Sequence, residues 1–145
     1  MSATVGYLLD TNVLLALIRA NALGKAIDRR FSLRMSMNRS MICVVTTGEM
    51  LSLTRQFGWG QGKRDQLQAL LHEVVTIDID HPEILDAYGE IDHQSRLLGK
   101  PMGKNDVWIA ATAKVVDLPL LTTDRDFDHL DGTHLNRILI DPHSA

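Results

Sequence analysis

Two acidic residues directly follow short apolar runs of the chain. Asp10 comes after Val5-Gly6-Tyr7-Leu8-Leu9, and Asp124 comes after Pro119-Leu120-Leu121-Thr122-Thr123. Short runs of this composition, bounded by polar residues, are typical of strands that are buried inside a sheet. We therefore expect both carboxylates at the carboxyl end of a strand, which is the edge of an α/β sheet where ligands bind.

Two further acids stand near the start of predicted helices. Glu49 ends the sequence Thr46-Thr47-Gly48-Glu49, which follows another apolar run and has the form of a capping box. Asp106 follows the loop over 97–104, and Asn105 is expected to cap the helix that begins there. Taken singly, each of the four acids has a structural explanation, as a helix cap or as a charge that complements a helix dipole.

Taken together, four carboxylates at one edge of a sheet need a compensating charge. Crowded carboxylates repel one another, and burying them without compensation is costly. Mg²⁺ and Mn²⁺ are hard divalent cations that prefer oxygen ligands. Such a cation can activate water and neutralise the charge that builds on a phosphoryl oxygen. The four acids together therefore predict a site for a hard divalent cation.

Small polar residues adjoin the four acids and are candidates for orienting them. Thr11 and Asn12 follow Asp10, and hydrogen bonds from neighbours of this kind fix metal-ligating carboxylates. Asp126 and Asp128 lie just beyond Asp124 and are expected to be solvated rather than coordinating. Asp128, one helical turn beyond Asp124, is the better candidate of the two for an accessory metal ligand. The supporting residues predicted in this way are Thr11, Asn12, Asn105 and Thr123.

Other metal and nucleotide chemistries match the sequence less well. The stretch from Asp124 to Asp128 is similar to the start of a calcium loop, but His129 stands where glycine is needed and Leu135 where the bidentate acid belongs. The chain has neither a P-loop nor a dinucleotide-binding glycine fingerprint, and its six histidines lack the spacing of a zinc site. The one cysteine, Cys43, lies among apolar residues and is expected in the core.

Length and composition indicate a single domain over residues 1–145. A hydrophobic content of 45% and a charged content of 23% are ordinary for a soluble protein. No apolar run approaches the ~20 residues of a membrane helix, and the single cysteine favours a reducing cytoplasm.

The net charge of -3 argues against nucleic-acid binding through bulk charge. It leaves open whether Arg29, Arg30, Arg34 and Arg39 form a solvated helical face or a patch that meets phosphate or a partner.

Predicted strands alternate with predicted helices along the chain. Strands are expected over 5–9, 41–45, 74–78, 119–123 and 137–140. Helices are expected over 13–19, 21–38, from the capping box to 57, over 63–73, over 82–98 and from 105 onward. This alternation predicts an α/β fold with a mainly parallel sheet of about five strands covered on both faces. Trp59, in the glycine-rich loop 58–62, is expected to cover the core.

Four stretches of the chain, in order, resemble the PIN-domain family, and the whole layout is similar to the VapC ribonuclease toxins of toxin–antitoxin systems. The likeness extends from about Tyr7 to Ile140. It rests on the stretches Leu9-Asp10-Thr11-Asn12, Thr47-Gly48-Glu49, Asn105-Asp106-Val107-Trp108-Ile109-Ala110-Ala111-Thr112 and Thr122-Thr123-Asp124-Arg125-Asp126-Phe127.

The resemblance implies a three-layer α/β/α sandwich and an endoribonuclease that depends on Mg²⁺ or Mn²⁺. It assigns the acidic metal-binding and catalytic set to Asp10, Glu49, Asp106 and Asp124, with support from Thr11, Thr123 and Asn105. It also implies a homodimer and an antitoxin protein that blocks the site. The alternative is a non-catalytic PIN domain that binds RNA or protein. Lys104 either pairs with Asp106 or meets a substrate phosphate, and the target RNA cannot be inferred from the sequence.

Overall fold

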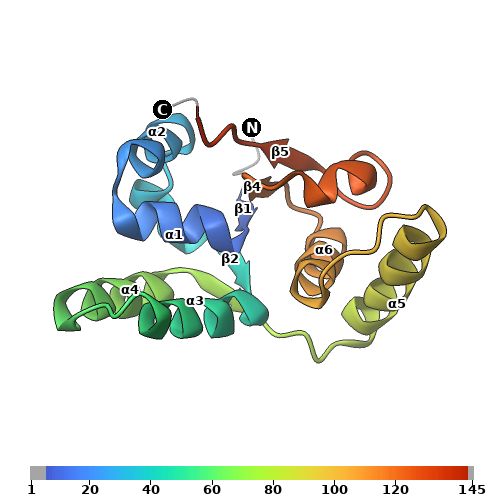
Figure 1. Cartoon of the computed structure of the whole chain (residues 1–145), viewed down its shortest axis with the longest axis horizontal. Coiled ribbons are helices and arrows are strands. Elements are labelled where there is room, and N and C mark those ends of the chain that lie inside the picture. Colours follow the sequence, from blue (N-terminus) through green and yellow to red (C-terminus); the bar gives the residue numbers. More distant parts are fainter. Residues whose placement is uncertain (1–5, 144–145) are drawn as a thin grey trace.

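The computed structural model describes residues 6–143, in which helices cover both sides of one sheet (Figure 1). The strands are β1 (Tyr7–Leu9), β2 (Ser40–Cys43), β3 (Val75–Ile77), β4 (Leu120–Thr122) and β5 (Arg137–Leu139). The α-helices are α1 (Thr11–Arg19), α2 (Ala22–Phe31), α3 (Val44–Gln56), α4 (Gln61–Glu73), α5 (Pro82–Leu97) and α6 (Lys104–Val116). Two short 3₁₀ segments, η1 (Arg34–Arg39) and η2 (Arg125–Leu130), complete the fold.

The five strands form a parallel sheet in the order β3-β2-β1-β4-β5. Leu8 of the central strand β1 is level with Met41 of β2 on one side and with Leu120 of β4 on the other. Because the strands run in the same direction, their carboxyl ends meet at one edge of the sheet. This topology confirms the predicted parallel sheet and brings the residues that follow β1 and β4 side by side.

Successive strand residues alternate between two hydrophobic cores. Leu8 and Leu120 lie in the core shared with α5, α6 and η2, together with the buried Cys43. Leu9 and Leu121 belong to the core shared with α1, α2, α3 and α4. Figure 1 shows these two groups of helices on opposite sides of the strands. The predicted three-layer α/β/α sandwich is therefore confirmed, and Trp59 packs against the second of these cores as expected.

The helix that carries Glu49 begins earlier than the sequence predicts. Strand β2 ends at Cys43, and α3 begins directly at Val44 without a side-chain cap. The predicted capping box is therefore wrong, since Thr46 lies inside the first turn of α3. The β-branched pair Val44-Val45 favours a strand by composition, but tertiary packing overrides this weak local preference.

Two other predicted boundaries are also wrong. Helix α6 begins at Lys104 with Gly103 as its N-terminal cap residue, so Asn105 does not cap it. The single helix predicted over 21–38 is broken at Ser32, whose left-handed backbone (φ 54°) ends α2 before η1 begins. The first predicted strand includes Val5, which lies outside the described residues.

None of the helices in the described part of the chain has the length and apolar character needed to cross a membrane.

Candidate metal centre

Asp10 is the most deeply buried acid of the candidate site. It lies between β1 and α1, caps the N-terminus of α1, and is only 3% exposed. Its Oδ1 accepts a hydrogen bond from the backbone N of Thr11 (2.7 Å), and its Oδ2 accepts from the hydroxyl of Thr122 (2.6 Å) and from Asn12 Nδ2 (3.2 Å). Because three donors from two neighbouring segments hold it, this carboxylate has a fixed orientation.

Thr122, the last residue of β4, connects two of the acids. Its Oγ1 donates to Asp10 Oδ2 and accepts from the backbone N of Asp124 (2.9 Å), while the residue itself is fully buried. Thr123, the neighbour predicted from the sequence, contributes instead through its backbone N, which donates to Asn12 Oδ1 (3.2 Å). Strand β4 pairs with β1, and that pairing places the hydroxyl of its final residue beside Asp10. The predicted strand ends at Thr123, one residue later than β4, and for this reason Thr122 was not predicted as a site residue.

Glu49 is held at the site by the threonine that follows Asp10. Thr11 Oγ1 donates to Glu49 Oε1 (2.7 Å) and lies 3.2 Å from Thr46 Oγ1. Because α3 starts immediately after β2, its second turn places Glu49 next to the start of α1. Thr11 therefore contacts two of the four predicted acids, one through its backbone and one through its hydroxyl.

Asp106, Asp124 and Asp126 form the tightest group of carboxylates in the described part of the chain. Each offers one oxygen, and these three oxygens lie within 4.8 Å of one another. Asp106 is in the first turn of α6, and Asp124 caps η2 by accepting a hydrogen bond from the backbone N of Asp126 (2.9 Å). This turn folds Asp126 back toward Asp124, in the manner expected of an aspartate that bonds two residues ahead.

Asp126 and Asp128 have different surroundings in the structure. Both are exposed, as the expectation of solvated side chains requires, yet Asp126 belongs to the group with Asp106 and Asp124. Asp128, the predicted accessory ligand, instead makes ion pairs with Arg137 of β5 (2.9 Å) and with Arg125 (3.5 Å). Asp128 lies outside that group, and its carboxylate faces guanidinium groups.

The electrostatics of the site confirm that these acids act on one another. Burial raises the pKa of Asp10 to about 6, aided by the charges of Asp124 and Glu49 and opposed by its hydrogen bonds with Thr122 and Thr11. Burial and four neighbouring carboxylates raise the pKa of Asp106 to about 7. The pKa of Asp126 is also raised, first by burial and then by Asp124. The neighbours that act on Asp106 are Asp10, Asp124, Asp126 and Glu49.

The donor set of this centre fits a hard divalent cation. All of its charged groups are carboxylates, and burial together with the neighbouring negative charges raises the pKa of Asp10 to about 6 and the pKa of Asp106 to about 7. Oxygen ligands in this arrangement suit Mg²⁺ or Mn²⁺ and do not suit metals that prefer sulfur or imidazole. Asp106, Asp124 and Asp126 lie close enough together to share such a cation, and the charges of Asp10 and Glu49 act on Asp106 from nearby.

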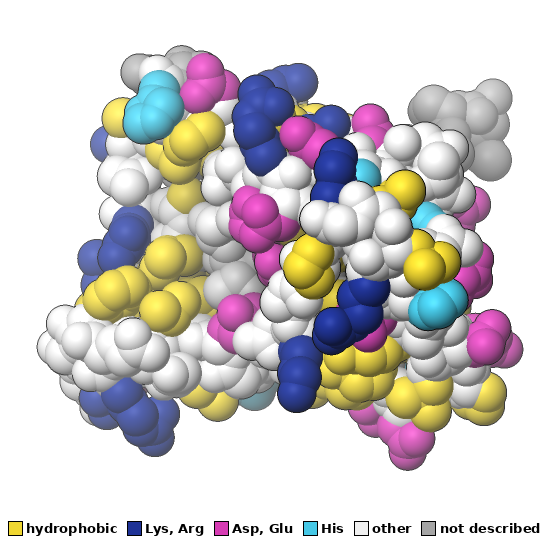
Figure 2. All heavy atoms as spheres, turned by 45° about the vertical axis from the view of Figure 1, so that its right-hand side comes forward, with side chains coloured by type: hydrophobic (Ala, Val, Ile, Leu, Met, Phe, Trp, Pro, Cys, Tyr) yellow, Lys and Arg dark blue, Asp and Glu magenta, His cyan; other side chains and the backbone are white. Residues whose placement is uncertain are grey.

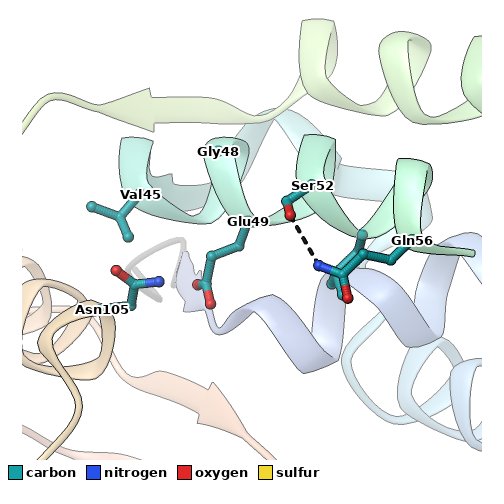
Figure 3. A pocket seen from close by; sticks show the side chains of 7 residues that line it. Val45, Gly48, Glu49, Ser52, Gln56 and Asn105 are labelled. Atoms are coloured by element: carbon teal, nitrogen blue, oxygen red, sulfur yellow. Dashed lines mark hydrogen bonds between the residues drawn. The ribbon is translucent and has the colours of Figure 1, made fainter.

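Asn105 faces a cleft next to the acidic centre. Figure 3 shows Asn105 from α6 and Glu49 from α3 extending into this cleft of about 430 Å³. Ser52 and Gln56 line its other end and are joined by a hydrogen bond from Gln56 Nε2 to Ser52 Oγ (3.0 Å). Ser52 and Gln56 are not predicted from the sequence, because their only signal is the helical spacing from Glu49.

The basic residues of the sequence analysis lie apart from the acidic group. Lys104 is exposed at the start of α6, and no ion pair found among residues 6–143 includes it, so the suggested pairing with Asp106 is not observed. The four arginines are exposed on α2 and η1, which contribute no acid to the site. On the face drawn in Figure 2, Lys and Arg side chains are interspersed with Asp and Glu and form no broad basic surface.

Comparison with known proteins identifies the family of this chain. The family model of the PIN domain matches residues 7–133. Ribonuclease VapC1 of Haemophilus influenzae strain R2866 is 30% identical over 118 residues, which cover 80% of this chain and 84% of the relative.

Solved structures share the fold. VapBC2 from Rickettsia felis, bound to a DNA fragment from its promoter, superposes with a TM-score of 0.77 at 18% identity, covering 94% of this chain and all of that one. VapBC-1 from nontypeable Haemophilus influenzae gives a TM-score of 0.73 at 24% identity, covering 93% and 98% of the two chains. The chain belongs to the PIN-domain family and is related within it to the VapC ribonucleases.

Proposed function

We propose that this protein is an endoribonuclease that depends on a divalent cation and hydrolyses RNA phosphodiester bonds. The observation that carries the proposal is the convergence of five carboxylates at the carboxyl edge of the sheet, where mutual repulsion and burial raise the pKa of Asp10 and Asp106. The identity with a relative named Ribonuclease VapC1 supports RNA as the substrate.

In this proposal Asp10, Glu49, Asp106 and Asp124 hold Mg²⁺ or Mn²⁺, and Asp126 assists them in place of Asp128. The bound cation supplies electrophilic chemistry, neutralising charge on a phosphoryl oxygen and favouring ionisation of water. Thr11 and Thr122 keep the carboxylates of Glu49 and Asp10 in orientation, with Asn12 and the backbone of Thr123 completing the hydrogen-bond chain.

The reaction is a hydrolysis without a covalent enzyme intermediate. An oxygen of water joins phosphorus, the bond from phosphorus to the leaving ribose oxygen breaks, and that oxygen takes up a proton. The thiol of Cys43 is no alternative nucleophile, because it is fully buried and burial raises its pKa. The neutral thiol is the less reactive form of cysteine.

We also infer that the protein is the toxin of a type II toxin–antitoxin pair in the cytoplasm, and that it forms a homodimer. Structural neighbours that are described as VapBC toxin–antitoxin complexes support the antitoxin partner. Co-expression with an antitoxin-like protein encoded beside it, followed by co-purification and light scattering, tests both the pairing and the dimer. A monomer that captures no such protein would contradict this part of the proposal.

The activity itself is tested by cleavage of a random-sequence RNA pool and of total cellular RNA. We expect the wild-type protein to cleave RNA with Mg²⁺ or Mn²⁺ and to lose cleavage on chelation. Asp10→Asn should lower the rate by a factor on the order of 1,000 or more while the circular dichroism spectrum is unchanged. Asp117→Asn is the matched control, since Asp117 is exposed at the end of α6 and its left-handed backbone (φ 55°) also accommodates asparagine. Full cleavage by Asp10→Asn would overturn the assignment.

A further inference from the structure

The cleft beside Glu49 differs in chemistry from the acidic centre that it adjoins. It lies between the outer face of α3 and the start of α6, and Glu49 forms part of its lining. Because Glu49 belongs to both the cleft and the acidic centre, a ligand in the cleft would lie next to RNA that is held at the acids.

The remaining lining residues are uncharged, and several of them form hydrogen bonds. Apart from Glu49, the cleft is lined by Val45, Gly48, Leu53 and three polar residues, Ser52, Gln56 and Asn105. Neither lysine, arginine nor histidine is among these lining residues, so the cleft offers no positive charge to a phosphate. Apolar surface together with amide and hydroxyl groups is the combination that binds the flat face and the polar edge of a nucleobase.

Ser52 and Gln56 are arranged to present both a donor and an acceptor. They lie one helical turn apart on α3, and Gln56 Nε2 donates to Ser52 Oγ over 3.0 Å (Figure 3). This bond leaves the hydroxyl hydrogen of Ser52 and the Oε1 of Gln56 for a ligand. The amide of Asn105 faces the same space from the other side of Glu49 (Figure 3).

A second hollow meets the acidic centre at Asp126 and contains cationic side chains. It has a volume of about 450 Å³, and Lys100 and Arg125 line it together with Asp126, Asp128 and His129. Cationic side chains of this kind suit the phosphates of a strand. The contrast between the two hollows favours base contacts at Glu49 and backbone contacts at Asp126.

We propose that the cleft formed by Ser52, Gln56 and Asn105 is a nucleobase subsite that selects the base next to the scissile phosphate. The proposal rests on the ribonuclease activity proposed above and adds to it the residues that set sequence preference. Hydrogen bonds from an amide and a hydroxyl distinguish bases by their edges, and one well-placed pair changes discrimination by roughly 5- to 100-fold.

The test is the sequence profile of cleavage in a random RNA pool, read by sequencing the ends of the products. We expect the wild-type protein to show a base preference at one position within two nucleotides of the cut. Gln56→Ala and Ser52→Ala should reduce that preference at least about fivefold, with preferences at other positions unchanged. Gln66→Ala, an exposed glutamine on α4 that lines neither hollow, is the matched control and should leave the profile as in wild type.

Other results of this experiment would overturn the proposed nucleobase subsite. A wild-type profile without base preference near the cut, or an unchanged profile in both variants, excludes base selection by this cleft. An unchanged profile with weakened binding of a co-expressed protein assigns the cleft to a protein partner. Failure of the ribonuclease proposal is distinguishable, because the wild-type protein would then cleave no more RNA than Asp10→Asn.

Discussion

At the scale of single residues, the acidic centre lowers the stability of the cation-free protein at neutral pH. Burial removes Asp106 from water, and the charges of four neighbouring carboxylates act on it. Its pKa of about 7 in the folded chain exceeds the ordinary value of 3.8. A raised carboxyl pKa means that the folded state binds this proton more tightly than the unfolded state does. The resulting stability is present below the ordinary pKa and is lost as pH rises through the folded pKa.

Removing the charge of Asp106 should therefore stabilise the cation-free protein at alkaline pH. For Asp106→Asn at pH 8 in a chelating buffer, we expect about 1 kcal/mol after allowance for partial exposure, or roughly 3 °C in Tm. The gain should shrink toward pH 5, where the wild-type carboxyl is largely protonated in the folded state. Thermal unfolding at the two pH values measures it, with Asp117→Asn as the control. A loss of stability at pH 8 would contradict the electrostatic account.

We expect the hydroxyl of Thr122 to contribute to activity, although the sequence does not identify it as a site residue. Thr122→Val removes the donor to Asp10 Oδ2 and the acceptor for the backbone N of Asp124 while nearly preserving shape. Hydrogen-bond partners of metal ligands typically contribute a factor of about 10 to 100 in metal affinity or activity, and we expect a loss of that size in kcat/KM.

Thr123→Val is the matched control for this substitution. Only the backbone of Thr123 enters the hydrogen-bond chain, through Asn12, so its side chain should be replaceable with little effect. Equal losses in the two variants would show that the hydroxyl of Thr122 has no special role.

At the scale of elements, the sequence predicts the acids better than the boundaries of the helices that carry some of them. Asp10 and Asp124 follow unmistakably apolar strands, and parallel pairing of β1 with β4 then brings them together. Glu49 and Asp106 reach the same place although the predicted starts of both of their helices are wrong. An error of one to three residues in a helix start changes the cap but leaves the acid within the first turns.

The contacts between side chains could not be predicted in the same way. Whether Thr122 or Thr123 meets Asp10 depends on the residue at which β4 ends, and the two neighbours have the same chemistry. The place of Asp126 depends on a turn formed by the side chain of Asp124. The pairing of Asp128 with Arg137 depends on contact between η2 and β5, which no local pattern reveals.

The packing of α2 on α1 gives a prediction at this scale, because α1 carries Thr11 and begins at Asp10. Gly24 of α2 lies so close to α1 that a Cβ there would be 2.1 Å from the carbonyl oxygen of Ala16. Gly24→Ala should therefore force the helices apart and cost about 1–3 kcal/mol of unfolding free energy. Urea unfolding followed by circular dichroism measures the change.

Gly89→Ala is the control for this substitution, with an expected effect of opposite sign. A Cβ at Gly89, inside α5, meets no atom within 4 Å. Alanine is favoured over glycine in a helix interior, so this variant should gain roughly 0.5–1 kcal/mol. A Gly24→Ala protein as stable as wild type would show that α1 and α2 are not packed as described.

At the scale of the whole molecule, the site exists only in the folded chain. Its acids come from four segments spread between residues 10 and 126, which the sheet and the helices on both of its sides bring to one edge. Their convergence concentrates negative charge at this edge, which a bound cation would neutralise without protonating the carboxylates. A cation that binds the folded state alone also stabilises it.

Calorimetric titration of Mn²⁺ into the purified protein at neutral pH is the measurement that tests this account most directly. We predict saturable binding with a Kd below about 1 mM, and affinity at least about tenfold weaker in Asp106→Asn and Asp124→Asn. Asp117→Asn should bind as the wild-type protein does. Absence of binding at millimolar Mn²⁺, or equal binding by all of these variants, would contradict the metal centre and would favour a PIN domain that binds RNA or protein without cleaving it.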